Sequence, residues 1–136
     1  MLLPLLAFIF GSLIIGAAVS QAGLLDLTLA AALTPSSTPT RALLGDPSVH
    51  YERYVLASPR ERLPLSIPQL VLHGDRDNSV SMRIATSYAA AARDAGDACE
   101  LVVLSRTGHF EHIDAHSEAW HVARDWIVAQ VSAARS

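Results

Sequence analysis

Two short apolar segments, each followed by a polar loop and a helical pattern, constrain the fold of this chain more than any other feature. The first covers residues 68–74 and the second covers residues 100–104. Amphipathic helical spacing follows each of them, at residues 82–95 and again after Ser117. This order of strand, loop, helix, strand, loop and helix predicts an α/β layered structure with parallel strands and helical crossovers.

The two helices carry their own end signals. Ser81 and Ser117 are good N-cap residues, and Gly96 ends the first helix. We expect two apolar stripes to face the sheet: Ile84, Tyr88, Ala91, Ala92 and Ala95 in the first helix, and Trp120, Ala123, Ile127 and Val131 in the second. Upstream, residues 24–33 and 41–54 predict short helical regions, and the proline-containing residues 57–68 predict a surface connection.

Composition limits the classes of function. Hydrophobic residues make up 51% and charged residues 17% of the 136 residues, which excludes a disordered tail. The net charge is -3 and all ten basic residues are arginine, so nucleic-acid binding through a broad basic face is not expected. The single cysteine, Cys99, cannot form an internal disulfide, and we expect it to be a small buried hydrophobe.

The N-terminal segment is apolar, and residues 1–25 contain no charged side chain. Residues 1–19 are long enough to cross a hydrocarbon core of roughly 30 Å as a helix, and would then be a membrane anchor. They could also be a signal sequence, or end in a buried strand over residues 13–20. We therefore divide the chain into residues 1–19 and 20–136. The buried strand favours the cytoplasm, and the other two alternatives favour a membrane-anchored or secreted protein.

Candidate catalytic residues follow both apolar segments. Asp75 and Asp77 follow the first segment and His109 follows the second. In a parallel sheet, catalytic groups gather beyond the carboxyl ends of the strands. An aspartate that meets a histidine there holds the imidazole in one tautomer and stabilises its protonated form. The aspartates could equally be turn formers that accept backbone N–H bonds, and His73 suggests a structural or pocket-lining role.

Two motifs carry a resemblance to a known family. HGDRDNSV fits the pattern H-G-x-x-D-x-x-V, and TGHF follows at residues 107–110. Together they resemble the C-terminal part of α/β-hydrolase-fold serine hydrolases, in particular esterases and prolyl-oligopeptidase-like peptidases. The resemblance implies that Asp77 is the acid and His109 the base of a Ser-His-Asp triad, with no cofactor. Weaker likeness covers residues 18–131, and His116 stands where the family commonly has proline.

Two parts of the family pattern are absent from the sequence: the G-x-S-x-G nucleophile elbow and the H-G-G-G-type oxyanion loop. A complete domain of this fold usually needs upwards of roughly 200 residues. We therefore expect a partial sheet, the C-terminal fragment of a hydrolase whose substrate is a small ester, an amide or a peptide. Ser20, in A-V-S-Q-A, has alanine at both glycine positions of the elbow, so we expect an ordinary strand serine there.

Two rival functions stay open. The chain could be a non-catalytic membrane-associated remnant anchored by residues 1–19. It could also bind a metal through the acidic and histidine side chains of one loop: His109, Glu111, His112, Asp114 and His116. However, the motif H-E-x-x-H needs glutamate where Ile113 stands. Because half of the sheet is missing, we expect residues 70–73 to lose a neighbouring strand and the chain to self-associate.

Overall fold

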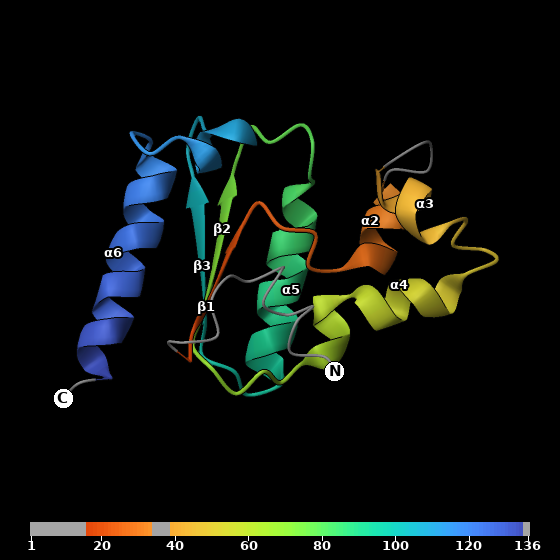
Figure 1. Cartoon of the computed structure of the whole chain (residues 1–136), viewed down its shortest axis with the longest axis horizontal. Helices are drawn as coiled ribbons and strands as arrows, with labels where there is room; N and C mark the ends of the chain where they lie inside the picture. The colour runs from red at the N-terminus through yellow and green to blue at the C-terminus, as the bar shows by residue number, and fades with distance from the viewer. Residues whose placement is uncertain (1–15, 34–38, 135–136) are drawn as a thin grey trace.

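The computed structural model describes residues 16–33 and 39–134 and shows an open parallel sheet with helices on both faces (Figure 1). The sheet has three strands in the order β1-β2-β3. They are β1 (Ala18–Gln21), β2 (Gln69–Gly74) and β3 (Cys99–Leu104). Both strand pairs are parallel, as the sequence predicts, and the class of the described fold is α/β.

The helices form layers on the two faces of the sheet. Figure 1 shows α5 (Met82–Asp94) on one face and α6 (Glu118–Ala133) on the other. The remaining helices lie between β1 and β2 or after β3 in the chain: α2 (Leu27–Leu33), α3 (Pro39–Leu44), α4 (Tyr51–Ala57) and the 3-10 helices η2 (Pro59–Arg62) and η3 (Phe110–Ile113). The short helices α2, α3 and α4 lie on the same side of the sheet as α5 (Figure 1).

Strand β2 is the centre of the sheet, and all six of its residues are buried. It pairs with β1 along one edge and with β3 along the other. The expectation that residues 70–73 lose a neighbouring strand is therefore wrong. The four-residue strand β1 covers that edge, with Ser20 opposite Val71. Within the described residues, the open edges of the sheet belong to β1 and β3.

Two apolar clusters hold the helices to the sheet. On the α5 side, Val71 packs with Leu25, Ile84 and Tyr88, and on the α6 side Leu72 packs with Ala123. Successive residues of β2 thus point to opposite faces, and both faces are covered by helices. This is why residues 70–72 in the middle of β2 are all apolar and do not alternate with polar residues.

The two large helices begin where the sequence predicts. The Ser81 hydroxyl accepts from the Arg83 N–H at 3.3 Å, and the Ser117 hydroxyl accepts from the Trp120 N–H at 3.1 Å. Gly96, with φ +94°, follows α5 in the left-handed conformation that ends many helices. Both predicted N-caps are confirmed.

Helix α6 departs from its predicted stripe. Ala123 is buried as expected, but Trp120 is 43% exposed and Ile127 is 37% exposed. The buried contact surface of α6 instead consists of Ala119 and Ala123 against Leu72 and Leu104. Among the described residues, the larger side chains of α6 are therefore only partly covered.

Most of the apolar N-terminal segment, residues 1–15, lies outside the described residues, so the division of the chain at residue 19 stays a prediction. The last part of that segment is visible as β1, which begins at Ala18. Among residues 16–33 and 39–134, every helix is too short or too polar to pass through a bilayer.

Candidate active site

Asp77 and His109 meet at the carboxyl ends of β2 and β3. Nδ1 of His109 lies 2.9 Å from Oδ2 of Asp77, inside the hydrogen-bonding range that the motifs predict. The Asp77 side chain is fully buried, whereas the His109 side chain is 31% exposed. The pair therefore consists of an enclosed carboxylate and an imidazole that reaches the surface.

Hydrogen bonds hold Asp77 in its charged form. Its Oδ1 accepts from the N–H groups of Ser79 and Val80, both at 2.8 Å. Burial raises the pKa of Asp77, but the bonds from Val80, His109 and Ser79 outweigh burial, and the pKa lies below its ordinary value. Because an ionised carboxylate can only accept, Nδ1 of His109 carries the proton in this contact.

His73 contacts the turn that contains Asp77. Its Nε2 lies 2.9 Å from the carbonyl oxygen of Val80, and since a carbonyl only accepts, Nε2 carries the proton. The same nitrogen is 3.5 Å from Oδ2 of Asp77. Val80 is itself buried in the α5 cluster. The His, Asp and Val positions of H-G-x-x-D-x-x-V are thus linked across one turn, and these contacts fit the structural alternative expected for His73.

Gly74 allows the two loops to approach each other. A Cβ atom there would overlap the backbone carbonyl of Thr107. The N–H of Asp75 donates to the carbonyl of Leu104 at 3.0 Å, and the N–H of Arg76 donates to that of Thr107 at 3.0 Å. These contacts join the loop after β2 to the loop after β3, and so they fix the positions of Asp77 and His109.

The other predicted candidates lie elsewhere. The side chain of Asp75 is exposed and takes no part in the pair. Ser20 is buried inside β1, which continues to Gln21, and the next helix begins only at Leu27. Ser20 is therefore not on the sharp strand-to-helix turn that a nucleophile elbow requires.

The histidine-rich loop does not assemble as a metal site. His112 is buried on η3, whereas Asp114 and His116 are exposed beyond the end of that helix. Across the described residues, no three His, Cys, Asp or Glu side chains form a group that could hold a metal ion. The metal-binding alternative therefore has no site in the part of the chain that is described.

Sequence reasoning missed one neighbour of the pair. The ring of Phe110 stands edge-on to the ring of His109, with the centroids 5.4 Å apart and the planes at 87°. Phe110 is 71% exposed, and Ile113, on the same short helix, is 83% exposed. Apolar surface therefore lies directly beside the accessible imidazole. The only sequence signal for it was the phenylalanine of TGHF.

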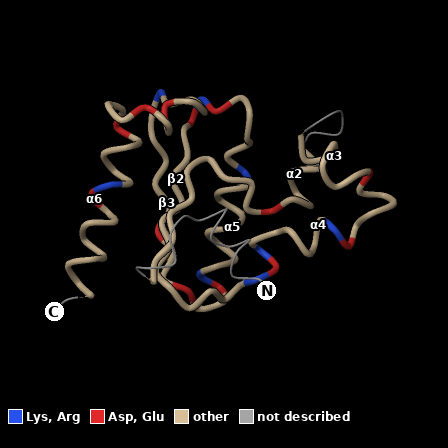
Figure 2. The backbone as a smooth tube through the Cα atoms, viewed as in Figure 1, with Lys and Arg blue, Asp and Glu red and all other residues tan. Residues whose placement is uncertain are grey.

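Charges of both signs surround the site. The loop after β2 contains Asp75, Arg76 and Asp77, and the loop after β3 contains Arg106 and Glu111. Figure 2 shows acidic and basic residues interspersed at this end of the sheet. The loops around the pair therefore carry no single sign of charge.

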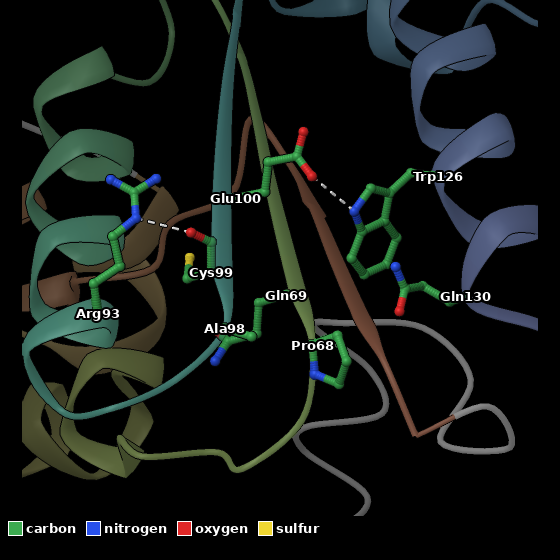
Figure 3. A pocket seen from close by; sticks show the side chains of 8 residues that line it. All are labelled: Pro68, Gln69, Arg93, Ala98, Cys99, Glu100, Trp126 and Gln130. Atoms are coloured by element: carbon green, nitrogen blue, oxygen red, sulfur yellow. Dashed lines mark hydrogen bonds between the residues drawn. The ribbon is translucent and has the colours of Figure 1, made fainter. Parts of the chain in front are cut away.

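A pocket of about 500 Å³ opens at the opposite end of the sheet (Figure 3). Trp126 from α6 donates to Glu100 at 3.1 Å across it, and the Arg93 Nε–H donates to the carbonyl of Cys99 at 2.8 Å. Burial raises the pKa of the Cys99 thiol, which fits a structural residue. Because this pocket lies at the amino ends of β2 and β3, it is separate from Asp77 and His109.

Comparison with known proteins gives one matching family and several solved structures of similar fold. The sequence model of the prolyl oligopeptidase family matches residues 10–132. Comparison with curated proteins gave no match. A truncated form of a carbohydrate esterase from gut microbiota is similar in structure, at 22% identity and a TM-score of 0.74 over 86% of this chain and 43% of that one.

Two further solved structures are similar. The propionate-bound esterase Est2 of the planctomycete Thermogutta terrifontis has 23% identity and a TM-score of 0.59 over 84% of this chain and 42% of its own. A putative dipeptidyl aminopeptidase IV from Bacteroides ovatus has 14% identity and a TM-score of 0.65. The match covers 85% of this chain and 15% of that one. At these identities the likeness shows the fold, a partial α/β-hydrolase sheet. The chain spans less than half the length of each of these proteins.

Proposed function

The chain belongs to the prolyl oligopeptidase family, and from this premise we propose that Asp77 and His109 are the acid and base of a Ser-His-Asp triad that hydrolyses ester or amide bonds. The observation that carries the proposal is the 2.9 Å contact between Nδ1 of His109 and the buried carboxylate of Asp77. It lies at the carboxyl ends of parallel strands, where sheets of this kind present their catalytic groups.

The chemistry follows from the tautomer. With the proton on Nδ1 held by Asp77, Nε2 of His109 is free to take the proton of a serine hydroxyl. The serine oxygen then bonds to the carbonyl carbon of the substrate, and the imidazolium returns the proton to the leaving alcohol or amine. Water attacks the acyl-enzyme by the same route. The serine and the oxyanion hole would come from outside the described residues, and no cofactor takes part.

The substrate class is a small-molecule ester or amide, or a peptide. Among the proteins of similar fold are esterases and a putative dipeptidyl aminopeptidase. His109 is partly exposed, so a leaving group can approach its ring from the surface. The alternative of a non-catalytic, membrane-associated remnant rests on the uncharged residues 1–19 alone. Recovery of the expressed chain in the detergent-free soluble fraction of cells would oppose it.

A chimera tests the proposed roles directly. Residues 18–134 would replace the part of the gut carbohydrate esterase that superposes on them, and the remainder of that esterase would have to supply the serine. We expect hydrolysis of a short-chain aryl ester, and a loss in kcat on the order of 10⁴ in the Asp77→Asn and His109→Ala variants. Asp75→Asn, at the exposed aspartate two residues away, is the matched control. A folded, active chimera that tolerates His109→Ala would refute the proposal.

The chain alone should be inactive. Without an activated serine and an oxyanion hole, the pair has no hydroxyl to deprotonate and no donors for the developing negative charge. We expect no turnover of the aryl ester and no labelling by a fluorophosphonate probe. The control is Ser20→Ala: labelling that disappears in this variant would make Ser20 the nucleophile and contradict the expectation.

A further inference from the structure

Asp77 presents its two carboxylate oxygens to different partners. Oδ1 accepts from the backbone N–H groups of Ser79 and Val80, both at 2.8 Å. Oδ2 lies 2.9 Å from Nδ1 of His109 and 3.5 Å from Nε2 of His73. The backbone bonds therefore fix the position of Oδ1, but they leave Oδ2 free to swing about it. The position of Oδ2 depends on the two imidazoles.

The fold holds these two imidazoles with different firmness. His73 lies on β2, the central strand, and its side chain is fully buried. His109 lies in the loop before the short helix η3, and its side chain is 31% exposed. A ring on a buried central strand has few alternative positions, whereas a loop side chain at the surface can move. His73 is therefore the partner that can fix Oδ2 before His109 binds to it.

Val80 closes the set of contacts around this carboxylate. Its N–H donates to Oδ1 of Asp77 at 2.8 Å. Its carbonyl oxygen lies 2.9 Å from Nε2 of His73, so Nε2 carries a proton. The same nitrogen is 3.5 Å from Oδ2 of Asp77, and both side chains are fully buried. At this distance the contact is electrostatic rather than a short hydrogen bond, and it gains strength because burial reduces screening by water.

We propose that His73 is a positioning residue of the Asp77–His109 pair, because its Nε2–H holds Oδ2 of Asp77 at the place where His109 binds it. The inference rests on the proposed function, since a positioning role needs a pair that transfers protons. His73 acts through Asp77 and takes no part in the proton transfer itself. A displacement of about 1 Å at a reacting group can cost on the order of 10² in rate, so loss of this contact should be measurable.

Two variants separate the N–H of His73 from its shape. Phenylalanine keeps a ring without a donor, and the amide nitrogen of glutamine reaches about as far along the side chain as Nε2. NMR of the ¹⁵N-histidine-labelled chain, in solution or as a sediment under magic-angle spinning, reports on the Nδ1–H proton of His109. We expect a downfield resonance in the wild type and in His73→Gln, and an upfield shift in His73→Phe as the bond to Asp77 loosens. His116→Phe, at an exposed histidine, should change nothing.

The chimera with the gut carbohydrate esterase gives a second readout. In an active chimera, His73→Phe should lower kcat by a factor on the order of 10² with little change in KM. His73→Gln should restore most of the lost kcat. A purely structural His73 would instead lower the free energy of unfolding and leave the His109 resonance of the folded variant unchanged.

Three results would overturn the inference. The first is a wild-type His73 protonated on Nδ1, since Nε2 would then have no proton to offer. The second is a His109 resonance that is unchanged, or moved further downfield, in folded His73→Phe. The third is a His73→Gln variant that behaves like His73→Phe. If His73→Phe does not fold, His73→Asn takes its place, because the asparagine amide stops short of the Nε2 position.

The two readouts also separate this inference from the proposed function. An inactive chimera would count against the proposed function. The NMR result needs no turnover, so it decides the role of His73 in either case.

Discussion

Asp77 combines full burial with a negative charge, and three hydrogen bonds make this possible. Two backbone N–H groups bind one carboxylate oxygen, and His109 and the more distant His73 face the other. A buried charge without such partners would be neutralised by a shift in pKa. The turn that follows β2 is therefore built around this carboxylate.

The first prediction concerns the pH dependence of stability. The pKa of Asp77 is lower in the folded chain than in the unfolded chain. The contribution of Asp77 to the stability of the folded state is therefore present when the pH is above the unfolded-state pKa of about 3.9. It is lost as the pH falls through the folded-state pKa. We expect Asp77→Asn to remove this part of the acid transition and to cost about 1–3 kcal/mol near pH 7.

Thermal melts between pH 2 and pH 7 measure this effect. Asp75→Asn is the control, because the Asp75 side chain is exposed and the same charge is removed. Parallel melting curves for Asp77→Asn and the wild type over the whole acid range would contradict the prediction.

The second prediction concerns Gly74. In Gly74→Ala the new methyl group meets the rigid backbone of Thr107, so the two loops must separate, at a cost of about 1–3 kcal/mol. Gly108→Ala is the control, since its Cβ would lie 3.0 Å from a carboxylate oxygen of Glu111, whose flexible side chain can move. In denaturant unfolding, the free energy of unfolding should be clearly lower for Gly74→Ala than for Gly108→Ala. Equal values for the two variants would refute the steric explanation.

At the residue scale, the sequence predicted the Asp77–His109 contact because both residues sit in short motifs after apolar segments. It did not predict the bond from His73 to Val80, since a histidine at a strand end gives no sign of its partner. The spacing of His112 and His116 suggested a metal site. The loop forms only a short 3-10 helix that ends at Ile113, so that spacing does not bring the two side chains to one face.

At the element scale, the large helices and the strands β2 and β3 could be predicted, because local periodicity and caps determine them. The position of β2 inside the sheet could not. Its partner β1 is four residues long and is separated from it by several short helices. Parallel pairing joins segments that are distant in the sequence, so no local sequence pattern predicts which strands pair.

The third prediction follows from the central position of β2. We expect the amides of residues 70–73 to exchange most slowly with deuterium, because the strand is paired along both edges and buried on both faces. The amides of β1 and β3 that face the open edges should exchange faster. Hydrogen exchange followed by NMR or mass spectrometry measures this order, and β2 amides that exchange as fast as those of β1 would contradict it.

At the scale of the whole molecule, the described chain leaves apolar surface and strand edges open. Phe110 and Ile113 are largely exposed beside the site, and Trp120 is partly exposed on α6. Open edges of β1 and β3 add unpaired backbone groups. Surfaces of this kind favour association between copies.

The fourth prediction is that the isolated chain self-associates. Light scattering at micromolar concentration should show oligomers or aggregates, and the double variant Phe110→Glu/Ile113→Glu should reduce their size. Leu43→Glu is the matched control, because Leu43 is 81% exposed but lies on α3, away from the sheet (Figure 1). A monodisperse wild-type monomer would contradict both this prediction and the expectation of a fragment.

The main-chain bonds between the two loops have a consequence for protein engineering. Because Asp75 and Arg76 bind Leu104 and Thr107 through backbone groups, their side chains are free to vary without moving Asp77 or His109. Within residues 69–113, the buried residues of β2 and α5 and the side chains of Asp77 and His109 must be kept, whereas the exposed loop positions can vary. A library randomised at positions 75, 76, 105 and 106 should retain the Asp77–His109 contact in most members.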